Sequence, residues 1–198
     1  MKTLLLIDIQ NDFLPGGALA VPDGDEVVPL VNAVMPEFDL VVATQDWHPA
    51  DHGSFAANQP GAAPYQQGFL GALPQTFWPV HCVQNTGGAL FAPGLETGRI
   101  DRVFPKGTNP VIDSYSGFYD NGHAAPTGLG EWLRSVGVTD LWVAGLATDY
   151  CVKFTVLDAL QLGFQVTVLR GACRGVELIG GDCDRAWEAM LTAGARLA

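Results

Sequence analysis

Basic residues are scarce in this chain. It has 10 Lys and Arg against 21 Asp and Glu, which gives a formal net charge of −11. Binding to a phosphate backbone or to an anionic lipid surface requires clustered positive charge. No stretch of the sequence gathers such a cluster. The charge pattern therefore excludes nucleic acids and membrane surfaces as expected partners.

Long apolar runs are also missing. A helix that spans a bilayer needs about 20 apolar residues, whereas runs such as residues 4–7 are much shorter. Only this short run precedes Asp8, so the N-terminus has no hydrophobic region of a secretion signal. We expect no transmembrane span and a cytoplasmic location.

Cysteine is used sparingly. The chain has four, Cys82, Cys151, Cys173 and Cys183, and none forms a CxxC pair. Dense cysteine spacing is typical of small secreted domains held by disulfides. We therefore expect four free thiols.

The chain is long enough for a single domain over residues 1–198. With 48% hydrophobic and 16% charged residues, it has the composition of a globular protein. Apolar runs typical of buried strands cover residues 3–9, 39–44, 102–104, 140–145 and 165–169. Helical patterns lie between and after them, at residues 25–36, 127–136, 148–162 and 182–193. This alternation predicts a three-layer α/β/α sandwich with a mostly parallel central sheet, whose sites lie at the carboxyl ends of the strands.

Residues 45–99 interrupt the alternation. The segment is rich in Gly, Pro, His, Trp and Gln and has little periodicity. Long irregular segments in ordered domains usually carry function. We expect this one to contribute to a binding site.

Three reactive side chains follow directly on predicted strands. Asp8 ends an apolar strand, where a buried carboxylate needs a partner. Lys106, in a chain with few lysines, follows another strand and could balance that charge. Cys151 lies in the first turn of a predicted helix, where unpaired N–H groups favour a thiolate and an oxyanion. The alternatives are a turn-capping carboxylate, a solvated lysine and an inert core thiol.

A metal site is indicated in the irregular segment. Asp46 and His48 are two residues apart, so in extended backbone they point to the same side. His81 could complete a set of three ligands, which leaves coordination positions open for water or substrate. The alternative is a chance grouping of loop histidines.

Five strings together resemble one family. They are DIQNDF (residues 8–13), QDWHP (45–49), WPVHC (78–82), FPKG (104–107) and GLATDYCV (145–152). In this order they resemble the isochorismatase-like cysteine hydrolases, and among these the bacterial nicotinamidases. The resemblance covers nearly the whole chain. It implies hydrolysis of nicotinamide to nicotinate and ammonia through a cysteine thioester, with pyrazinamide as a further substrate.

The resemblance also implies roles for the reactive residues. Asp8, Lys106 and Cys151 would form the catalytic triad. The backbone amides of Ala147 and Cys151 would hold the oxyanion, with the peptide bond from Leu146 to Ala147 corresponding to one that is cis in the family.

The remaining implied roles concern metal and substrate. Asp46, His48 and His81 would bind one divalent metal ion, either zinc, iron or manganese. The fourth ligand stays open between His52, Ser54 and water. The pyridine ring would stack on Phe13 and Trp78, and Tyr115 would form a pocket wall.

Two other functions remain open from the sequence. One is a relative that acts on another small amide or on the vinyl ether of isochorismate, although such relatives generally lack the Asp-x-His and His metal set. The other is a catalytically silent α/β binding module. The chain ends at residues 195–198, where relatives often continue into a further strand, so we expect a short last sheet edge. The assembly state, including a homo-oligomer, stays open.

Overall fold

The computed structural model describes residues 1–198 and contains one main sheet of six strands. The strands lie in the order β5-β2-β1-β6-β7-β8, and every neighbouring pair is parallel. Their bounds are β1 (Thr3–Ile7), β2 (Leu40–Asp46), β5 (Arg102–Lys106), β6 (Asp140–Leu146), β7 (Gln165–Arg174) and β8 (Arg196–Leu197).

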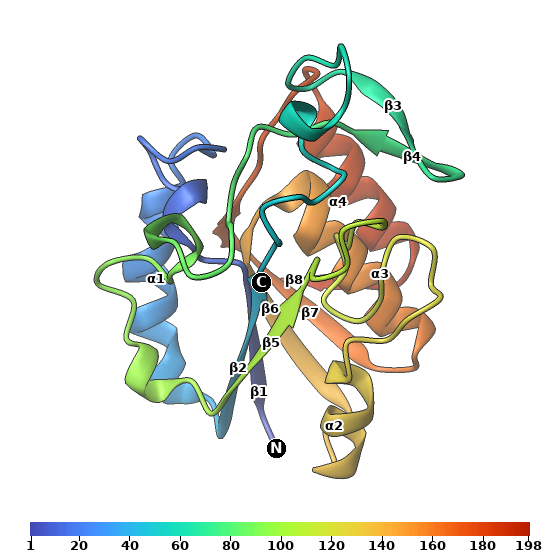
Figure 1. The fold of residues 1–198 in the computed structure, drawn as a ribbon. Coiled ribbons are helices and arrows are strands. Elements are labelled where there is room, and N and C mark those ends of the chain that lie inside the picture. The colour runs from blue at the N-terminus through green and yellow to red at the C-terminus, as the bar shows by residue number, and fades with distance from the viewer.

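Helices cover both faces of this sheet. Their bounds are α1 (Val27–Val34), α2 (Leu129–Ser135), α3 (Lys153–Gln161) and α4 (Asp182–Thr192). Helix α1 lies on one face, and α2, α3 and α4 lie on the other (Figure 1). The predicted three-layer α/β/α fold is confirmed. None of these helices is both long and apolar enough to cross a bilayer.

Alternate side chains of β1 enter two separate cores. Leu4 and Leu6 pack in one apolar cluster with Val27 and Val31 of α1. Leu5 and Ile7 belong to a second cluster, which includes residues of α2, α3 and α4. Because successive side chains of a strand point to opposite faces, a strand buried on both faces has the continuous apolar sequence seen here.

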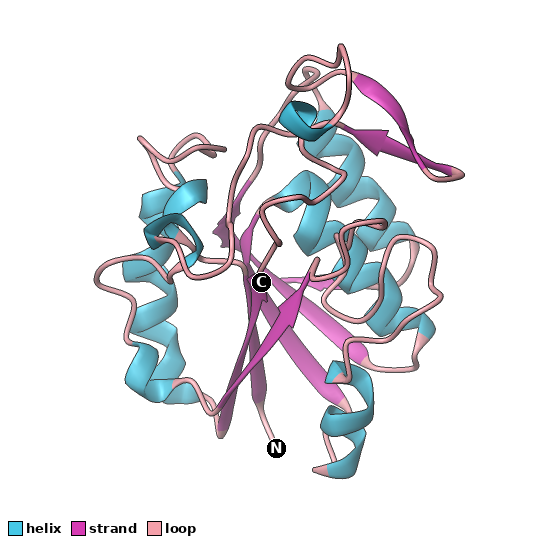
Figure 2. Cartoon of the chain, in the orientation of Figure 1, coloured by secondary structure: helices cyan, strands magenta, loops and turns pink.

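The irregular segment does contain a small unit that the sequence pattern did not predict. It is an antiparallel hairpin of β3 (Gln67–Leu70) and β4 (Leu73–Thr76), separate from the main sheet. Figure 2 shows the hairpin apart from the main sheet, near one end of α4. The two strands have the sequences QGFL and LPQT, which do not alternate between apolar and polar residues, and Phe69 is 68% exposed. The sequence pattern of a half-buried strand is therefore missing.

Two predicted helices differ from the observed ones. The predicted helix at residues 148–162 begins with a π-helical turn, Thr148–Val152, before α3 continues it. The predicted helix at 25–36 is an α-helix only over Val27–Val34, between the 3-10 turns Gly24–Glu26 and Met35–Glu37. Pro36 explains the second end: Met35 still has α dihedral angles and donates to the carbonyl of Val31, but the proline has no backbone N–H to donate the next helical hydrogen bond.

Candidate active site

The three reactive side chains meet at the carboxyl ends of their strands. Asp8 follows β1, Lys106 ends β5, and Cys151 lies in the π-helical turn after β6. Lys106 Nζ lies 2.9 Å from Asp8 Oδ2 and 3.4 Å from Cys151 Sγ. All three residues are buried. The parallel sheet therefore assembles a carboxylate, an ammonium and a thiol from residues far apart in sequence.

Asp8 is held in place by its neighbour strand. Thr44 Oγ1 on β2 donates to Asp8 Oδ1 at 2.6 Å and accepts the backbone N–H of Asp8 at 3.2 Å. Burial raises the pKa of the Asp8 carboxyl, against the opposing effect of Lys106. A raised pKa brings a carboxylate closer to the range in which it can accept and return a proton.

Burial works against ionisation of the Cys151 thiol. Burial raises its pKa well above the ordinary value for cysteine, while the ammonium of Lys106 opposes this shift. Burial thus opposes the thiolate that the start of the helix was expected to favour. A nearby proton acceptor is needed, and Asp8 is the carboxylate that contacts the same lysine.

The backbone before Cys151 has an unusual form. The peptide bond between Leu146 and Ala147 is cis, as the family resemblance implied. In the π-helical turn, the carbonyl of Ala147 accepts the N–H groups of both Tyr150 and Val152. Turns of this kind occur often at functional sites.

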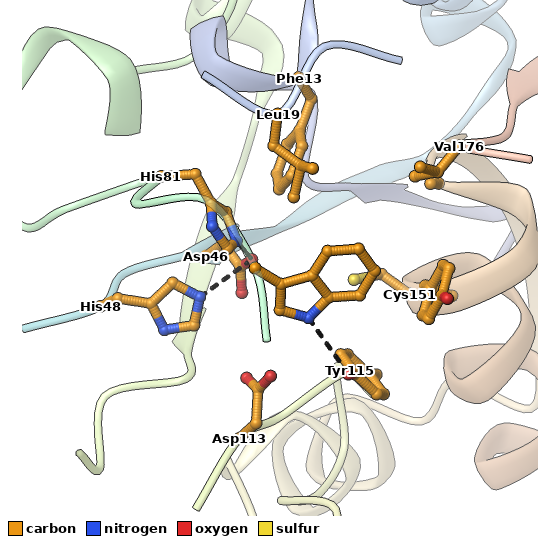
Figure 3. A pocket seen from close by; sticks show the side chains of 12 residues that line it. Phe13, Leu19, Asp46, His48, His81, Asp113, Tyr115, Cys151 and Val176 are labelled. Carbon is orange, nitrogen blue, oxygen red and sulfur yellow. Dashed lines mark hydrogen bonds and ion pairs between the residues drawn. The ribbon is translucent and has the colours of Figure 1, made fainter. Parts of the chain in front are cut away.

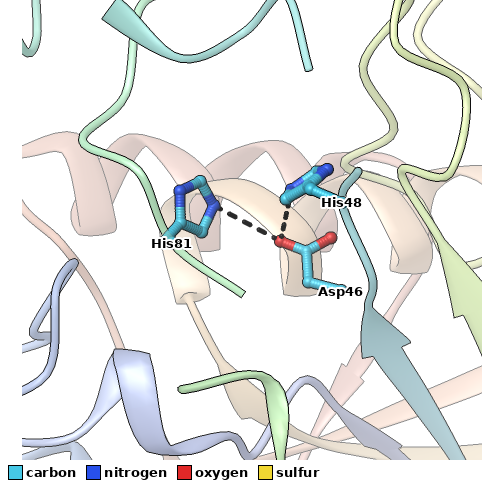
Figure 4. A group of neighbouring side chains, drawn as sticks. All are labelled: Asp46, His48 and His81. Atoms are coloured by element: carbon cyan, nitrogen blue, oxygen red, sulfur yellow. Dashed lines mark ion pairs between the residues drawn. The ribbon is translucent and has the colours of Figure 1, made fainter. Parts of the chain in front are cut away.

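Asp46, His48 and His81 form a buried group beside the lysine. Asp46 Oδ2 lies 3.3 Å from His48 Nε2 and 3.6 Å from His81 Nε2. Figure 4 shows both imidazole rings directed at this carboxylate. The three ligand atoms lie within 4.8 Å of one another, so one metal ion can contact them all.

The other imidazole nitrogens show how these rings are oriented. His48 Nδ1 lies 2.8 Å from the carbonyl oxygen of Gly107, and His81 Nδ1 lies 2.8 Å from that of Pro79. A proton on each Nδ1 leaves the Nε2 lone pairs directed at the carboxylate. One cation can be shared by such a set of acceptors, and backbone contacts of this type orient histidine ligands in metal sites. The donor set therefore fits a divalent metal.

The two candidates for a fourth ligand lie next to this group. His52 Nδ1 and Ser54 Oγ are 2.7 Å apart, while His52 Nε2 is buried without a hydrogen-bond partner. Burial and the neighbouring His48 lower the pKa of His52 to about 4. His52 forms a second potential ligand group with His48 and Asp113, a residue that the sequence did not single out.

An apolar cavity connects the thiol with the metal-binding group. Phe13, Trp78 and Tyr115, the residues expected around the substrate, line it together with Cys151. Figure 3 shows Phe13, Tyr115 and Cys151 around the same space as His48 and His81. Trp78 Nε1 donates to Tyr115 Oη at 3.2 Å, which ties two of the walls together.

Sequence reasoning missed part of this lining. The additional residues are Leu19, Asp113, Tyr150 and Val176. Tyr150 precedes the candidate nucleophile, so its place in the chain was a usable signal. Val176 is brought in by a connection after β7, where Asp149 accepts the backbone N–H groups of Val176 and Glu177 at 2.9 and 2.8 Å. The sequence pattern carries no sign of that contact.

Gly107 offers a direct test of the metal-binding group. It has φ of +64°, and a Cβ there would overlap the His48 ring. We expect Gly107→Ala to displace His48 and to weaken divalent-metal affinity about 10- to 100-fold, the usual cost of disturbing a ligand's supporting contacts.

Gly71→Ala is the matched control for this substitution. Gly71 has φ of +62°, but a Cβ there would meet nothing within 4 Å. It should impose similar backbone strain and leave metal affinity unchanged in an isothermal titration. Equal affinity in the two variants would contradict the role given to His48.

The fold and the grouped thiol, carboxylate and ammonium define the class of α/β cysteine hydrolases. The isochorismatase domain model matches residues 2–197. The chain is 54% identical to the nicotinamidase of Escherichia coli strain K12 over 99% of its own length and 93% of that protein. It thus belongs to the isochorismatase family.

Solved structures agree with this assignment. An Acinetobacter baumannii nicotinamidase and pyrazinamidase has a TM-score of 0.96 and 41% identity, with 99% of this chain and 94% of that chain covered. The pyrazinamidase of Pyrococcus horikoshii in complex with zinc has a TM-score of 0.81 and 39% identity, with 100% of this chain and 98% of that chain covered.

Proposed function

We propose that this protein is a nicotinamidase, an amidohydrolase that converts nicotinamide to nicotinate and ammonia and also accepts pyrazinamide. The observation that carries the proposal is that Lys106 contacts both Asp8 and Cys151, and that Cys151 lines an apolar cavity. The similarity to nicotinamidases over nearly the full chain supports the choice of substrate.

Asp8 and Cys151 carry the covalent chemistry. Asp8 takes the thiol proton, and the sulfur attacks the carbon of the carboxamide. The carbon–nitrogen bond then breaks as Asp8 returns the proton to the leaving ammonia, which leaves a thioester on Cys151. Water attacks the thioester with Asp8 again as base, the carbon–sulfur bond breaks, and nicotinate and the free thiol are released.

Lys106 makes the charged states of this cycle tolerable. Burial alone would lower its pKa, but Asp46 and Asp8 hold the pKa of the Lys106 ammonium well above the ordinary value. It therefore stays charged throughout and stabilises the thiolate. The backbone amides of Ala147 and Cys151 are the proposed donors to the tetrahedral oxyanion.

Asp46, His48 and His81 would hold a divalent ion, with His52 or Ser54 as the proposed fourth ligand. Imidazole and carboxylate ligands suit zinc, iron and manganese. When bound, such an ion supplies a Lewis-acid contact for the pyridine nitrogen. Phe13 and Trp78 would hold the aromatic ring, and Tyr115 would close the cavity beside it.

The cytoplasmic location expected from the sequence is part of the proposal. All four cysteines are unpaired in the structure. Free thiols are the normal state of cysteine in a reducing compartment.

A histidine substitution separates substrate anchoring from chemistry. His48→Ala should lower bound metal and raise the Michaelis constant for nicotinamide, because the substrate ring loses its anchor. Metal content would be measured by mass spectrometry. His123→Ala is the matched control, since His123 is a half-exposed histidine outside the cavity. Full metal occupancy in the His48 variant would count against this site.

The proposal is tested by following ammonia release from nicotinamide. A coupled assay should show turnover, with none above background on isochorismate. The opposite preference would favour the runner-up function within the family. An absence of turnover on both substrates would favour a silent binding module.

A further inference from the structure

Asp46 contacts two functional groups at once. Its Oδ2 faces the Nε2 atoms of His48 and His81 at 3.3 and 3.6 Å. Its Oδ1 accepts a hydrogen bond from Lys106 Nζ at 2.6 Å. This contact is shorter than the 2.9 Å contact between Lys106 Nζ and Asp8 Oδ2. One buried carboxylate therefore joins the metal-binding group to the catalytic lysine.

The remaining contacts of Lys106 leave it little freedom. Besides the two carboxylates, Nζ lies 2.9 Å from the backbone carbonyl oxygen of Ser114 and 3.4 Å from Cys151 Sγ. The lysine side chain is fully buried, so bulk solvent does not screen its charge. Whatever changes the charge on Asp46 must change how strongly Lys106 is attracted toward Asp8 and the thiol.

The backbone that carries this carboxylate is held firmly by Gln10. Gln10 Oε1 accepts the backbone N–H of Asp46 at 2.7 Å, and Gln10 Nε2 donates to its carbonyl oxygen at 2.8 Å. Gln10 is completely buried and also donates to the carbonyl oxygen of Ala89 at 2.9 Å. The backbone of Asp46 is thus fixed between the two groups that it contacts.

We propose that Asp46 is a positioning residue for Lys106 as well as a metal ligand, and that it couples metal occupancy to the reactivity of Cys151. A divalent cation on Oδ2 draws the negative charge of the carboxylate toward itself. The hold of Oδ1 on Lys106 weakens, and the ammonium interacts more strongly with Asp8 and the sulfur. Metal binding therefore favours the thiolate, and by reciprocity the lysine charge weakens metal binding.

This inference rests on the proposed roles of Asp46, Lys106 and Cys151, but its test does not use turnover. The readout is the rate of Cys151 alkylation by iodoacetamide, assigned by peptide mass spectrometry to separate it from the other thiols. Mn²⁺ is the metal probe, because carboxylate and imidazole ligands suit it whereas thiolates prefer softer ions. A protein that hydrolyses nicotinamide without this coupling would fail the test and keep its proposed function.

The first measurement uses the wild-type protein without and with saturating Mn²⁺ at one pH. We expect Mn²⁺ to raise the alkylation rate at least about fivefold, the lower end of typical coupling between sites. An unchanged or lower rate would overturn the proposal.

The second measurement compares metal-free variants. Asp46→Asn removes the charge that holds Lys106 but keeps the side-chain shape, so its Cys151 should be alkylated at least about fivefold faster than in the metal-free wild type. Asp158→Asn neutralises a buried carboxylate outside the cavity, so it should match the metal-free wild type. Equal rates in the two variants would show that Asp46 serves the metal alone.

A substitution of Lys106 tests the same coupling if Asp46→Asn does not fold. Lys106→Gln removes the ammonium charge and keeps a donor group, so we expect at least about fivefold tighter Mn²⁺ binding by calorimetry. Cys151→Ala, which leaves the lysine in place, should bind Mn²⁺ as the wild type does. Unchanged affinity in Lys106→Gln would contradict the coupling.

Discussion

Replacing Cys151 with alanine should reduce ammonia release from nicotinamide by about 10⁴-fold or more, the scale seen when a nucleophile is removed from a catalytic triad. No other thiol lines the cavity, so no neighbouring sulfur can substitute. The substitution removes one atom at the cavity wall, and the melting temperature should change little. The measurement is a steady-state assay beside a thermal melt.

The control for this variant is Cys173→Ala. Cys173 is a buried free thiol like Cys151, with relative exposures of 5% and 7%, but it lies on β7 outside the cavity. It should keep its activity and lose only the modest stability expected for a smaller core side chain. Substantial turnover by Cys151→Ala would remove the cysteine from the mechanism.

Replacing Lys106 with methionine should have the largest effect on stability. The side chain of Lys106 is fully buried and contacts Asp8 and Asp46 at 2.9 and 2.6 Å. Removing one partner of a buried ion pair leaves uncompensated charge and typically costs about 3–5 kcal/mol. Here two carboxylates lose the same partner. The loss should appear in urea unfolding of the metal-free protein as a lower midpoint.

Lys2→Met is the matched control for this substitution. Lys2 forms an exposed ion pair with Glu37 at 3.3 Å. Pairs of this kind contribute at most about 1 kcal/mol. If both methionine variants lost the same stability, the charge network around Lys106 would not have the structural weight assigned to it.

The sequence predicted the central part of the site because of the sheet's geometry. Asp8, Lys106 and Cys151 each follow a strand, and parallel strands bring their carboxyl ends to one edge. Continuous apolar runs identified those strands, since both faces of the sheet are covered. The charge of a buried aspartate and lysine also required partners, and the structure shows that they contact each other.

Other parts of the structure depend on contacts that no local pattern reveals. The β3–β4 hairpin leaves Phe69 exposed rather than packed on the core. Its sequence therefore lacks the alternation of apolar and polar residues that predicts a half-buried strand. Asp113 lines the cavity and accepts a hydrogen bond from Gln75 of that hairpin at 2.9 Å. The π-helical turn at Thr148–Val152 differs from an α-helix in its hydrogen bonds rather than in its apolar pattern.

The sequence also could not predict that Asp46 contacts both the metal-binding histidines and Lys106. Its spacing from His48 indicated a metal ligand, and that spacing says nothing about the second oxygen. The contact between Oδ1 and Lys106 arises because β2 and β5 are neighbours in register, with Asp46 opposite Lys106. A prediction of this contact requires the strand order, which the sequence pattern left undetermined.

The most direct test of the account is a rapid-quench experiment with nicotinamide and the metal-loaded protein. Mass spectrometry of the quenched protein should find a nicotinoyl group on the peptide that contains Cys151, and ammonia should appear before nicotinate. Nicotinate formed in step with ammonia, with no adduct on Cys151 at any time point, would contradict the proposed covalent route.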